Sequence, residues 1–129
     1  MISTINDAAW PVNSTYALPA SPSSAKLARQ LMRGALRDCP DPLVEVAELL
    51  VSELVGNALR HSACAPVMRI EVESGCVRVA VQDDSPDLPQ IQAANPDADG
   101  GRGLLLVDAL ATSWGCSRTP EGKRVWFTL

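Results

Sequence analysis

The sequence predicts an α+β fold, a two-layer sandwich in which helices cover one face of a mostly antiparallel mixed sheet. Apolar residues recur at helical spacing in two segments that each open with a proline, and apolar and polar residues alternate in two pairs of short segments. A glycine-rich loop between these pairs opens a third segment of helical character. The length of 129 residues is typical of one domain spanning residues 1–129, with residues 1–14 as a candidate flexible arm.

The N-terminal half is predicted to form one strand and two helices. Residues 15–18 have the character of a short strand. Ser21-Pro22 is typical of a helix start, and the spacing behind it predicts a helix that ends before Pro40. Asp41-Pro42 repeats this start signal and predicts a longer helix over residues 43–60.

The C-terminal half is predicted to form two hairpins with a loop and a helix between them. Alternation on either side of Ser74-Gly75 predicts the first hairpin, because that dipeptide is typical of a tight turn. The loop is rich in Pro, Asp, Asn and Gly, and loops of such length in compact domains are usually functional or mobile. The predicted hairpin, loop, helix and hairpin cover residues 67–82, 85–101, 104–110 and 114–129.

Composition and charge disfavour several classes of function. The 11 basic and 15 acidic residues give a net charge of −4 without a Lys/Arg cluster, which argues against a nucleic-acid-binding surface. The apolar stretches are too short for a membrane span, and the first residues do not resemble a signal peptide, so the cytoplasm is the expected compartment. The sequence has one histidine and four cysteines without a CxxC pair, which disfavours a zinc site. We therefore expect the cysteines to be free thiols.

Polar side chains lie on the edge of the apolar stripe of the second predicted helix. Glu53 and Asn57 are one turn apart beside apolar neighbours, and His61 extends the ridge by another turn. Burial of a carboxylate and an amide is unfavourable unless something pairs with them, which favours a functional ridge. A half-exposed helix edge with locally satisfied polar groups is the alternative, and spacing alone leaves the two equally open.

Two further segments carry groups suited to a base and a phosphate. Asp83 directly follows an alternating strand, where its carboxylate can accept a hydrogen bond from the exocyclic amine of a base. Gly100-Gly101-Arg102-Gly103 precedes a predicted helix, where close backbone approach and free amides favour a phosphate and Arg102 adds a charge. Each has a commoner alternative, because Asp-Ser-Pro is an ordinary turn and glycines also give plain loop flexibility.

Together these segments resemble the nucleotide-binding boxes of the GHKL (HATPase_c) superfamily, which includes gyrase, MutL and histidine kinases. Residues 53–61 (ELVGNALRH) are similar to its N box, residues 83–85 (DDS) to its G1 box, and residues 101–104 (GRGL) to its G2 box. Residues 122–128 (GKRVWFT) resemble its closing strand with the last glycine box. The resemblance covers about residues 25–129, implies the Bergerat (HATPase) fold, and is strongest to small anti-sigma-factor serine kinases.

The resemblance implies roles for individual residues. Asn57 would hold the Mg²⁺ that bridges the ATP phosphates, and Glu53 would be the catalytic general base. Asp83 would bind the adenine amino group, and residues 101–103 would bind the phosphates, with residues 85–100 as the ATP lid. The implied ATP-binding positions are Asn57, His61, Asp83, Ser85, Gly101, Arg102, Gly103, Leu104 and Thr128, the last close to adenine.

The sequence departs from the family pattern in the G1 box, which normally reads Asp-x-Gly-x-Gly. Ser85 and Asp87 replace both glycines, and the G2 box lacks a second glycine after Leu104. These departures favour adenine binding over efficient phosphoryl transfer.

Two functional hypotheses follow from the resemblance. The first is an ATP- and Mg²⁺-dependent serine/threonine protein kinase that phosphorylates a small antagonist protein and sequesters a sigma factor or another transcription regulator. The second is a non-catalytic module that holds such a protein partner when ATP orders the lid, which the altered G1 box favours. The presence of Glu53, Asn57 and Asp83 disfavours a purely structural domain. A homodimer is compatible with the sequence but not required by it.

Overall fold

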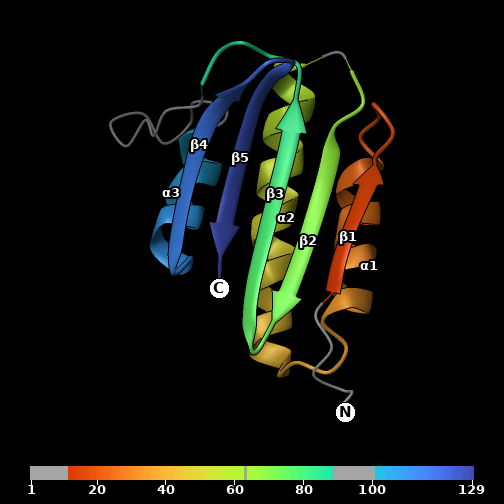
Figure 1. The fold of residues 1–129 in the computed structure, drawn as a ribbon, viewed down its shortest axis with the longest axis vertical. Helices are drawn as coiled ribbons and strands as arrows, with labels where there is room; N and C mark the ends of the chain where they lie inside the picture. The colour runs from red at the N-terminus through yellow and green to blue at the C-terminus, as the bar shows by residue number, and fades with distance from the viewer. Residues whose placement is uncertain (1–11, 63, 89–100) are drawn as a thin grey trace.

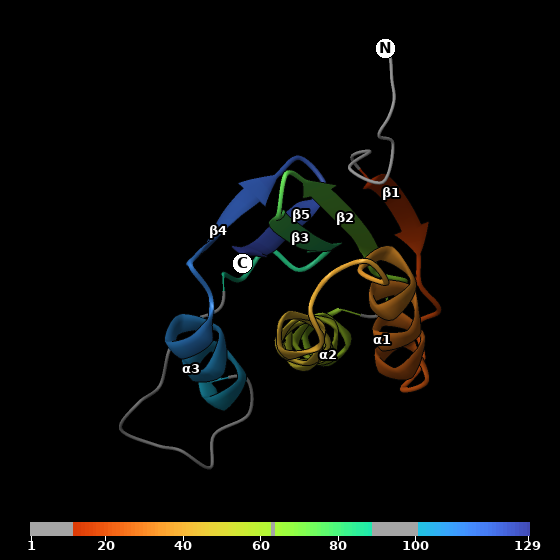
Figure 2. The same ribbon diagram turned by 90° about the horizontal axis from the view of Figure 1, so that it is seen from below.

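The computed structural model describes residues 12–62, 64–88 and 101–129, and within these ranges three helices lie on one face of a five-stranded sheet (Figure 1). Figure 2 shows the helices in one layer and the strands in the other, which confirms the predicted α+β sandwich. The elements along the chain are β1 (Val12–Ala17), α1 (Ser24–Ala35), α2 (Asp41–His61), β2 (Val67–Glu73), β3 (Cys76–Asp83), α3 (Gly101–Leu110), β4 (Ser113–Thr119) and β5 (Gly122–Thr128).

The strands follow the order β1-β2-β3-β5-β4, and every pairing among the described residues is antiparallel. The described sheet is therefore wholly antiparallel, where we expected a mostly antiparallel mixed one. After β3 the chain passes through α3 to the outer strand β4, and β5 then returns between β4 and β3. This topology places the start of β5 beside the end of β3, so that Asp83 pairs with Lys123.

Local sequence signals explain two element boundaries. Pro42 lies in the first turn of α2, where no backbone N–H is needed and the fixed φ suits a helix, so α2 already begins at Asp41. Ser74 and Gly75 have positive φ angles of 50° and 79°, the geometry of a tight two-residue turn, and they join β2 to β3 in the predicted hairpin.

The N-terminal strand begins earlier than expected. β1 starts at Val12, so residues 12–14, which we expected in the arm, belong to the sheet, while residues 1–11 lie outside the described ranges. The four cysteines are free thiols, as predicted. No helix of the described ranges is long and apolar enough to cross a membrane.

The core fills the space between the sheet and the helices. Its fully or almost fully buried side chains include Met32, Leu50, Leu54, Ile70, Val79 and Phe127. Towards solvent, polar contacts fix α1 to α2: Arg33 donates to both carboxylate oxygens of Glu48, at 2.9 and 3.1 Å, and Arg29 donates to Oγ of Ser52 at 2.9 Å. With one side packed on the sheet and another held by α1, α2 presents its polar ridge in a defined direction.

Candidate functional site

Asn57 occupies the middle of the polar ridge on α2, and only 3% of its surface is exposed. Among the described residues, its Oδ1 is the one buried side-chain nitrogen or oxygen without a hydrogen-bond partner. An unsatisfied buried acceptor costs about 1–3 kcal/mol, so each such group calls for an explanation, for example a bound ion, water or ligand. Because an amide oxygen accepts N–H donors and binds hard cations, the unpaired Oδ1 makes Asn57 a candidate ligand-binding residue.

The start of α3 packs against Glu53, one turn before Asn57. A Cβ added at Gly103 would lie 2.6 Å from Oε2 and 3.4 Å from Cβ of Glu53, so the start of α3 lies directly against this side chain. Gly101 and Arg102 form the first residues of the helix, whose free backbone amides favour an anion. The side chain of Arg102 lies outside the described part of the chain.

Asp83 and Lys123 form a buried ion pair where β3 ends and β5 begins. Nζ of Lys123 lies 2.9 Å from Oδ2 and 3.1 Å from Oδ1 of Asp83, and the two side chains are 0% and 2% exposed. The backbone N–H of Ser85 also donates to Oδ1, at 2.8 Å. Lys123 is not among the residues predicted for the site, although Lys123, Val125 and Phe127 alternate along β5 and the two apolar residues identify their shared face as the inner one.

Gly122 lets β5 pass close to the turn that follows β3. A Cβ at this position would lie 2.6 Å from Cα of Asp84. The exposed Asp84 side chain accepts a hydrogen bond from Ser62, just after α2. Hydrogen bonding by Cys64, and then by Ser62, lowers the pKa of the Asp84 carboxyl. Asp84 thus ties the end of α2 to the end of β3, whereas Asp83 faces the interior.

His61 is the last residue of α2, and its side chain is exposed. Partial desolvation lowers its pKa below the usual value, the positive charges of Lys123 and Arg60 lower it further, and Asp83 and Asp87 oppose the shift. The imidazole is therefore mostly neutral at pH 7.

The structure gathers most of the predicted residues at one end of the sandwich. Figure 1 shows the end of α2, the end of β3 and the beginnings of α3 and β5 at the same, upper end of the molecule. Ser85 is buried there, and its Oγ accepts the N–H of Asp87 at 3.2 Å, which stabilises the turn after β3. Leu104 packs its side chain into the core, so only its backbone remains for a ligand. Residues 89–100 of the expected lid lie outside the described ranges.

Thr128 lies away from the other residues predicted for the site. β5 runs away from Asp83, so Thr128 lies opposite Arg78, and Lys123 lies opposite Asp83. Five residues of strand separate Thr128 from that position, roughly 17 Å. Oγ1 of Thr128 instead forms a hydrogen bond of 2.6 Å with Ser113 on β4. Lys123, and not Thr128, is therefore the neighbour on β5 of Asp83, the residue expected to bind the base.

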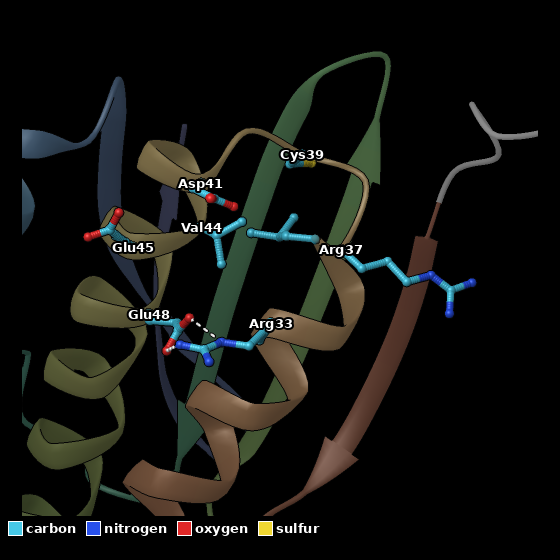
Figure 3. Close-up of a pocket in the computed structure, with 8 residues that line it drawn as sticks. Arg33, Arg37, Cys39, Asp41, Val44, Glu45 and Glu48 are labelled. Carbon is cyan, nitrogen blue, oxygen red and sulfur yellow. Dashed lines mark hydrogen bonds and ion pairs between the residues drawn. The ribbon is translucent and has the colours of Figure 1, made fainter.

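A pocket of about 480 Å³ lies at the other end of α2, where it meets the end of α1 (Figure 3). Figure 3 shows Arg33 and Glu48 paired in its wall, whereas Arg37 extends away from it. Glu48 in the pocket wall and Asn57 are separated by more than two turns of α2, so this pocket is separate from the candidate site. We assign the site to Asn57 because the unpaired buried acceptor is there.

The residues around Asn57 fit Mg²⁺ bound together with phosphates. Oδ1 is a hard oxygen donor, and Glu53 adds a carboxylate one turn away. Throughout the described ranges, no group of three or more His, Cys, Asp or Glu is arranged to hold a metal by itself. Mg²⁺ typically keeps several waters and is bound through one or two side chains plus substrate phosphates, so this sparse donor set suits it.

Comparisons with known proteins agree with this geometry. No curated protein matches the chain, whereas its structure matches 12 chains of solved structures. One of them is the crystal structure of the RsbU and RsbW domains of Rv1364c from Mycobacterium tuberculosis, with a TM-score of 0.69 and 20% identity, which shows a shared fold. That match covers 91% of this chain and 32% of the solved one, so the chain spans about a third of that protein.

The family model of the histidine kinase-like ATPase domain matches residues 18–129. The matched range contains the ridge of α2, the Asp83–Lys123 pair and the start of α3, and membership implies a nucleotide site. The chain therefore belongs to the histidine kinase-like ATPase domain family.

Proposed function

We propose that the chain is an ATP- and Mg²⁺-binding regulatory protein that acts as a serine/threonine protein kinase of the anti-sigma-factor type. The observation that carries this proposal is the buried, unpaired Oδ1 of Asn57, one turn from Glu53. Bound Mg²⁺ would neutralise phosphate charge. Phosphoryl transfer depends mainly on positioning and charge stabilisation, so few protein groups are sufficient for it.

Each part of the site has a role in this proposal. Asn57 holds the metal, and the free amides at the start of α3, from Gly101 to Gly103, contact the phosphates. Asp83 accepts a hydrogen bond from the base. Glu53, which lies on α2 against the start of α3, orients the attacking hydroxyl and accepts its proton.

The protein partner follows from the same chemistry. A small antagonist protein supplies a serine or threonine hydroxyl in line with the γ-phosphate, and a sigma factor or another transcription regulator is the protein that is sequestered. The resemblance of the sequence to anti-sigma-factor kinases and the fold shared with a solved RsbW domain support this class of partner.

Calorimetric titration with ATP, with and without Mg²⁺, tests the nucleotide site. We expect Mg²⁺ to strengthen ATP binding to the wild type. In the presence of Mg²⁺, Asn57→Ala should weaken ATP binding about 10- to 100-fold, the effect of losing one charge-assisted contact. Asp83→Asn should weaken ATP binding with or without the metal. Asn13→Ala is the matched control, because Asn13 is exposed on β1 and contacts Arg69. Absence of ATP binding to the wild type would refute the proposal.

A second candidate is a non-catalytic, nucleotide-gated module that binds a protein partner. It is favoured by the turn in which Ser85 and Asp87 replace the glycines of the G1 box, because the Ser85 contact to Asp87 fixes that turn. Transfer of labelled γ-phosphate from ATP to candidate antagonists separates the two functions. A kinase should lose transfer in Glu53→Gln while still binding ATP, and Glu45→Gln, on an exposed face of α2, should retain it. Tight ATP binding without transfer by the wild type would favour the module.

A further inference from the structure

The outer face of the sheet, which points away from the helices, carries a small pocket. Figure 2 shows the helices on one side of the sheet, and no described element covers the other side. The pocket has a volume of about 210 Å³, and its lining comes from the adjacent strands β1, β2, β3 and β5. It is therefore open to a partner that approaches the sheet from the side opposite the helices.

A small residue at the centre of the outer face explains the pocket. Ala80 lies on the middle strand β3, and the register places Arg69 of β2 on one side of it and Trp126 of β5 on the other. Arg78 and Gln82 lie on the same face of β3, because side chains alternate along a strand. The methyl group of Ala80 is far shorter than these neighbours, so it forms the floor of the pocket.

Three exposed arginines, Arg69, Arg78 and Arg124, line the pocket, and Glu71 is the one carboxylate among its lining residues. Arg69 donates to Oδ1 of Asn13 at 3.1 Å, and its Nη2 lies 3.9 Å from Oε2 of Glu71. Arg78 and Arg124 form no ion pair with any residue of the described ranges. The lining therefore carries an excess of positive charge that the described part of the chain leaves unpaired.

Stacking on Trp126 holds one of these guanidinium groups in place. Cζ of Arg78 lies 4.8 Å from the centre of the Trp126 ring, a cation–π contact that contributes about 0.5–1 kcal/mol at an exposed site. The ring is positioned in turn by Gly115 on β4, where an added Cβ would lie 2.8 Å from Cζ2 of Trp126. Stacking occupies the flat face of the guanidinium and leaves its N–H edge free, and this edge suits both oxygens of a carboxylate.

The surroundings of the arginines favour separate carboxylates over a continuous polyanion. The whole chain has a net charge of −4, so the excess of positive charge is a local feature of this face. Glu71 in the lining repels a dense row of phosphates, whereas a peptide can place its carboxylates against the arginines and away from Glu71. An acidic peptide is therefore the anion that this charge pattern complements.

The spacing of the two unpaired arginines also suits a peptide. Arg78 lies opposite Thr128, four residues along β5 from Arg124, which corresponds to roughly 13 Å. In an extended peptide, side chains that point the same way repeat about every 6.8 Å, so the first and third of three alternate carboxylates are also separated by roughly 13 Å.

We propose that the outer face of the sheet is a docking surface for an acidic segment of a protein partner, in which Arg78 and Arg124 pair with carboxylates of that segment. Asn57 and the rest of the candidate nucleotide site lie on the helical side of the sheet. The docking surface therefore does not rest on the proposed nucleotide site, and it can be occupied with or without nucleotide.

Fluorescence anisotropy with a short labelled peptide of alternating glutamate and serine tests the surface in the absence of nucleotide. The wild type should bind this peptide at least about tenfold more tightly than its counterpart with glutamine in place of glutamate. Arg78→Gln and Arg124→Gln should each weaken binding about three- to tenfold, the loss of one partly screened charge-assisted contact. Arg37→Gln is the matched control, because it removes the same charge from an exposed position at the helical side.

Arg78→Lys separates pairing from simple attraction, because it keeps the charge but removes the planar fork of donors. It should weaken binding of the glutamate peptide nearly as much as Arg78→Gln, and full affinity in Arg78→Lys would overturn the proposed pairing. Equal binding of the two peptides by the wild type would also overturn it, as would an equal loss in Arg37→Gln and Arg78→Gln. Binding of single-stranded DNA as tight as that of the glutamate peptide would show a general polyanion surface instead. None of these results depends on whether the protein binds ATP.

Discussion

Among single residues, Lys123 is a position on which stability depends, because its ammonium is buried against the carboxylate of Asp83. Lys123→Met leaves the carboxylate of Asp83 buried and unpaired, so we expect the free energy of unfolding to fall by about 3–5 kcal/mol. The double variant Lys123→Met with Asp83→Asn should recover most of this loss, because no buried charge remains. Denaturant unfolding measures both, and Arg124→Met should change stability by less than about 0.5 kcal/mol. Equal stability of Lys123→Met and the wild type would contradict the buried pair.

His61 provides a second test at the same scale, because it is the only histidine and gives one unambiguous NMR titration. Desolvation and then the charge of Lys123 lower its pKa, so the fitted value should lie below about 6.5 and should rise in Lys123→Met. In the unfolded chain the pKa of His61 is higher, so its imidazole binds a proton more readily there than in the folded protein. The stability contributed by neutral His61 is therefore complete above about pH 6.5 and is lost as the pH falls through the folded pKa. A pKa above that of an ordinary histidine would contradict the structure.

Among the secondary-structure elements, two glycines with opposite surroundings predict opposite effects of alanine. Gly34 is exposed in the last turn of α1 with nothing within 4 Å of an added Cβ, so Gly34→Ala should stabilise the helix by up to about 1 kcal/mol. Gly122→Ala places a Cβ 2.6 Å from Cα of Asp84, so β5 or the turn after β3 must shift, at a cost of roughly 1–3 kcal/mol. Thermal unfolding of both variants checks these two predictions. A stabilising Gly122→Ala would show that β5 does not approach the turn after β3 as closely as described.

The elements also show how far sequence reasoning reaches. α2 and the β2–β3 hairpin could be predicted because their signals are local: Asp41-Pro42 begins the helix, and Ser74-Gly75 forms the turn. The pairing of β5 with β3 is not local, because the chain first passes through α3 and β4. Without that register, the partner of Asp83 could not be identified, and Thr128 was expected near the base, whereas Lys123 is the residue of β5 beside Asp83.

For the whole molecule, the site is an assembly of segments that lie far apart in the sequence. α2 supplies Glu53 and Asn57, and the start of α3 packs against Glu53 through Gly103. The ends of β3 and β5 supply Asp83 and Lys123. The ridge on α2 was recognisable from residue spacing, but burial of Asn57 without a partner is a property of the assembled fold. A ligand that satisfies this acceptor should therefore stabilise the molecule as a whole.

Binding of ATP with Mg²⁺ should accordingly raise the unfolding temperature. A ligand at 100 times its Kd stabilises the folded state by about 2.7 kcal/mol, which corresponds to about 10 °C for a domain of this size. The part of the shift that depends on Mg²⁺ should disappear in Asn57→Ala, because the variant lacks Oδ1, and should persist in Asn13→Ala. Differential scanning fluorimetry with ATP, Mg²⁺ and both together measures the three contributions. A shift with Mg²⁺ that is the same in Asn57→Ala and in the wild type would place the metal elsewhere and remove the role of Asn57.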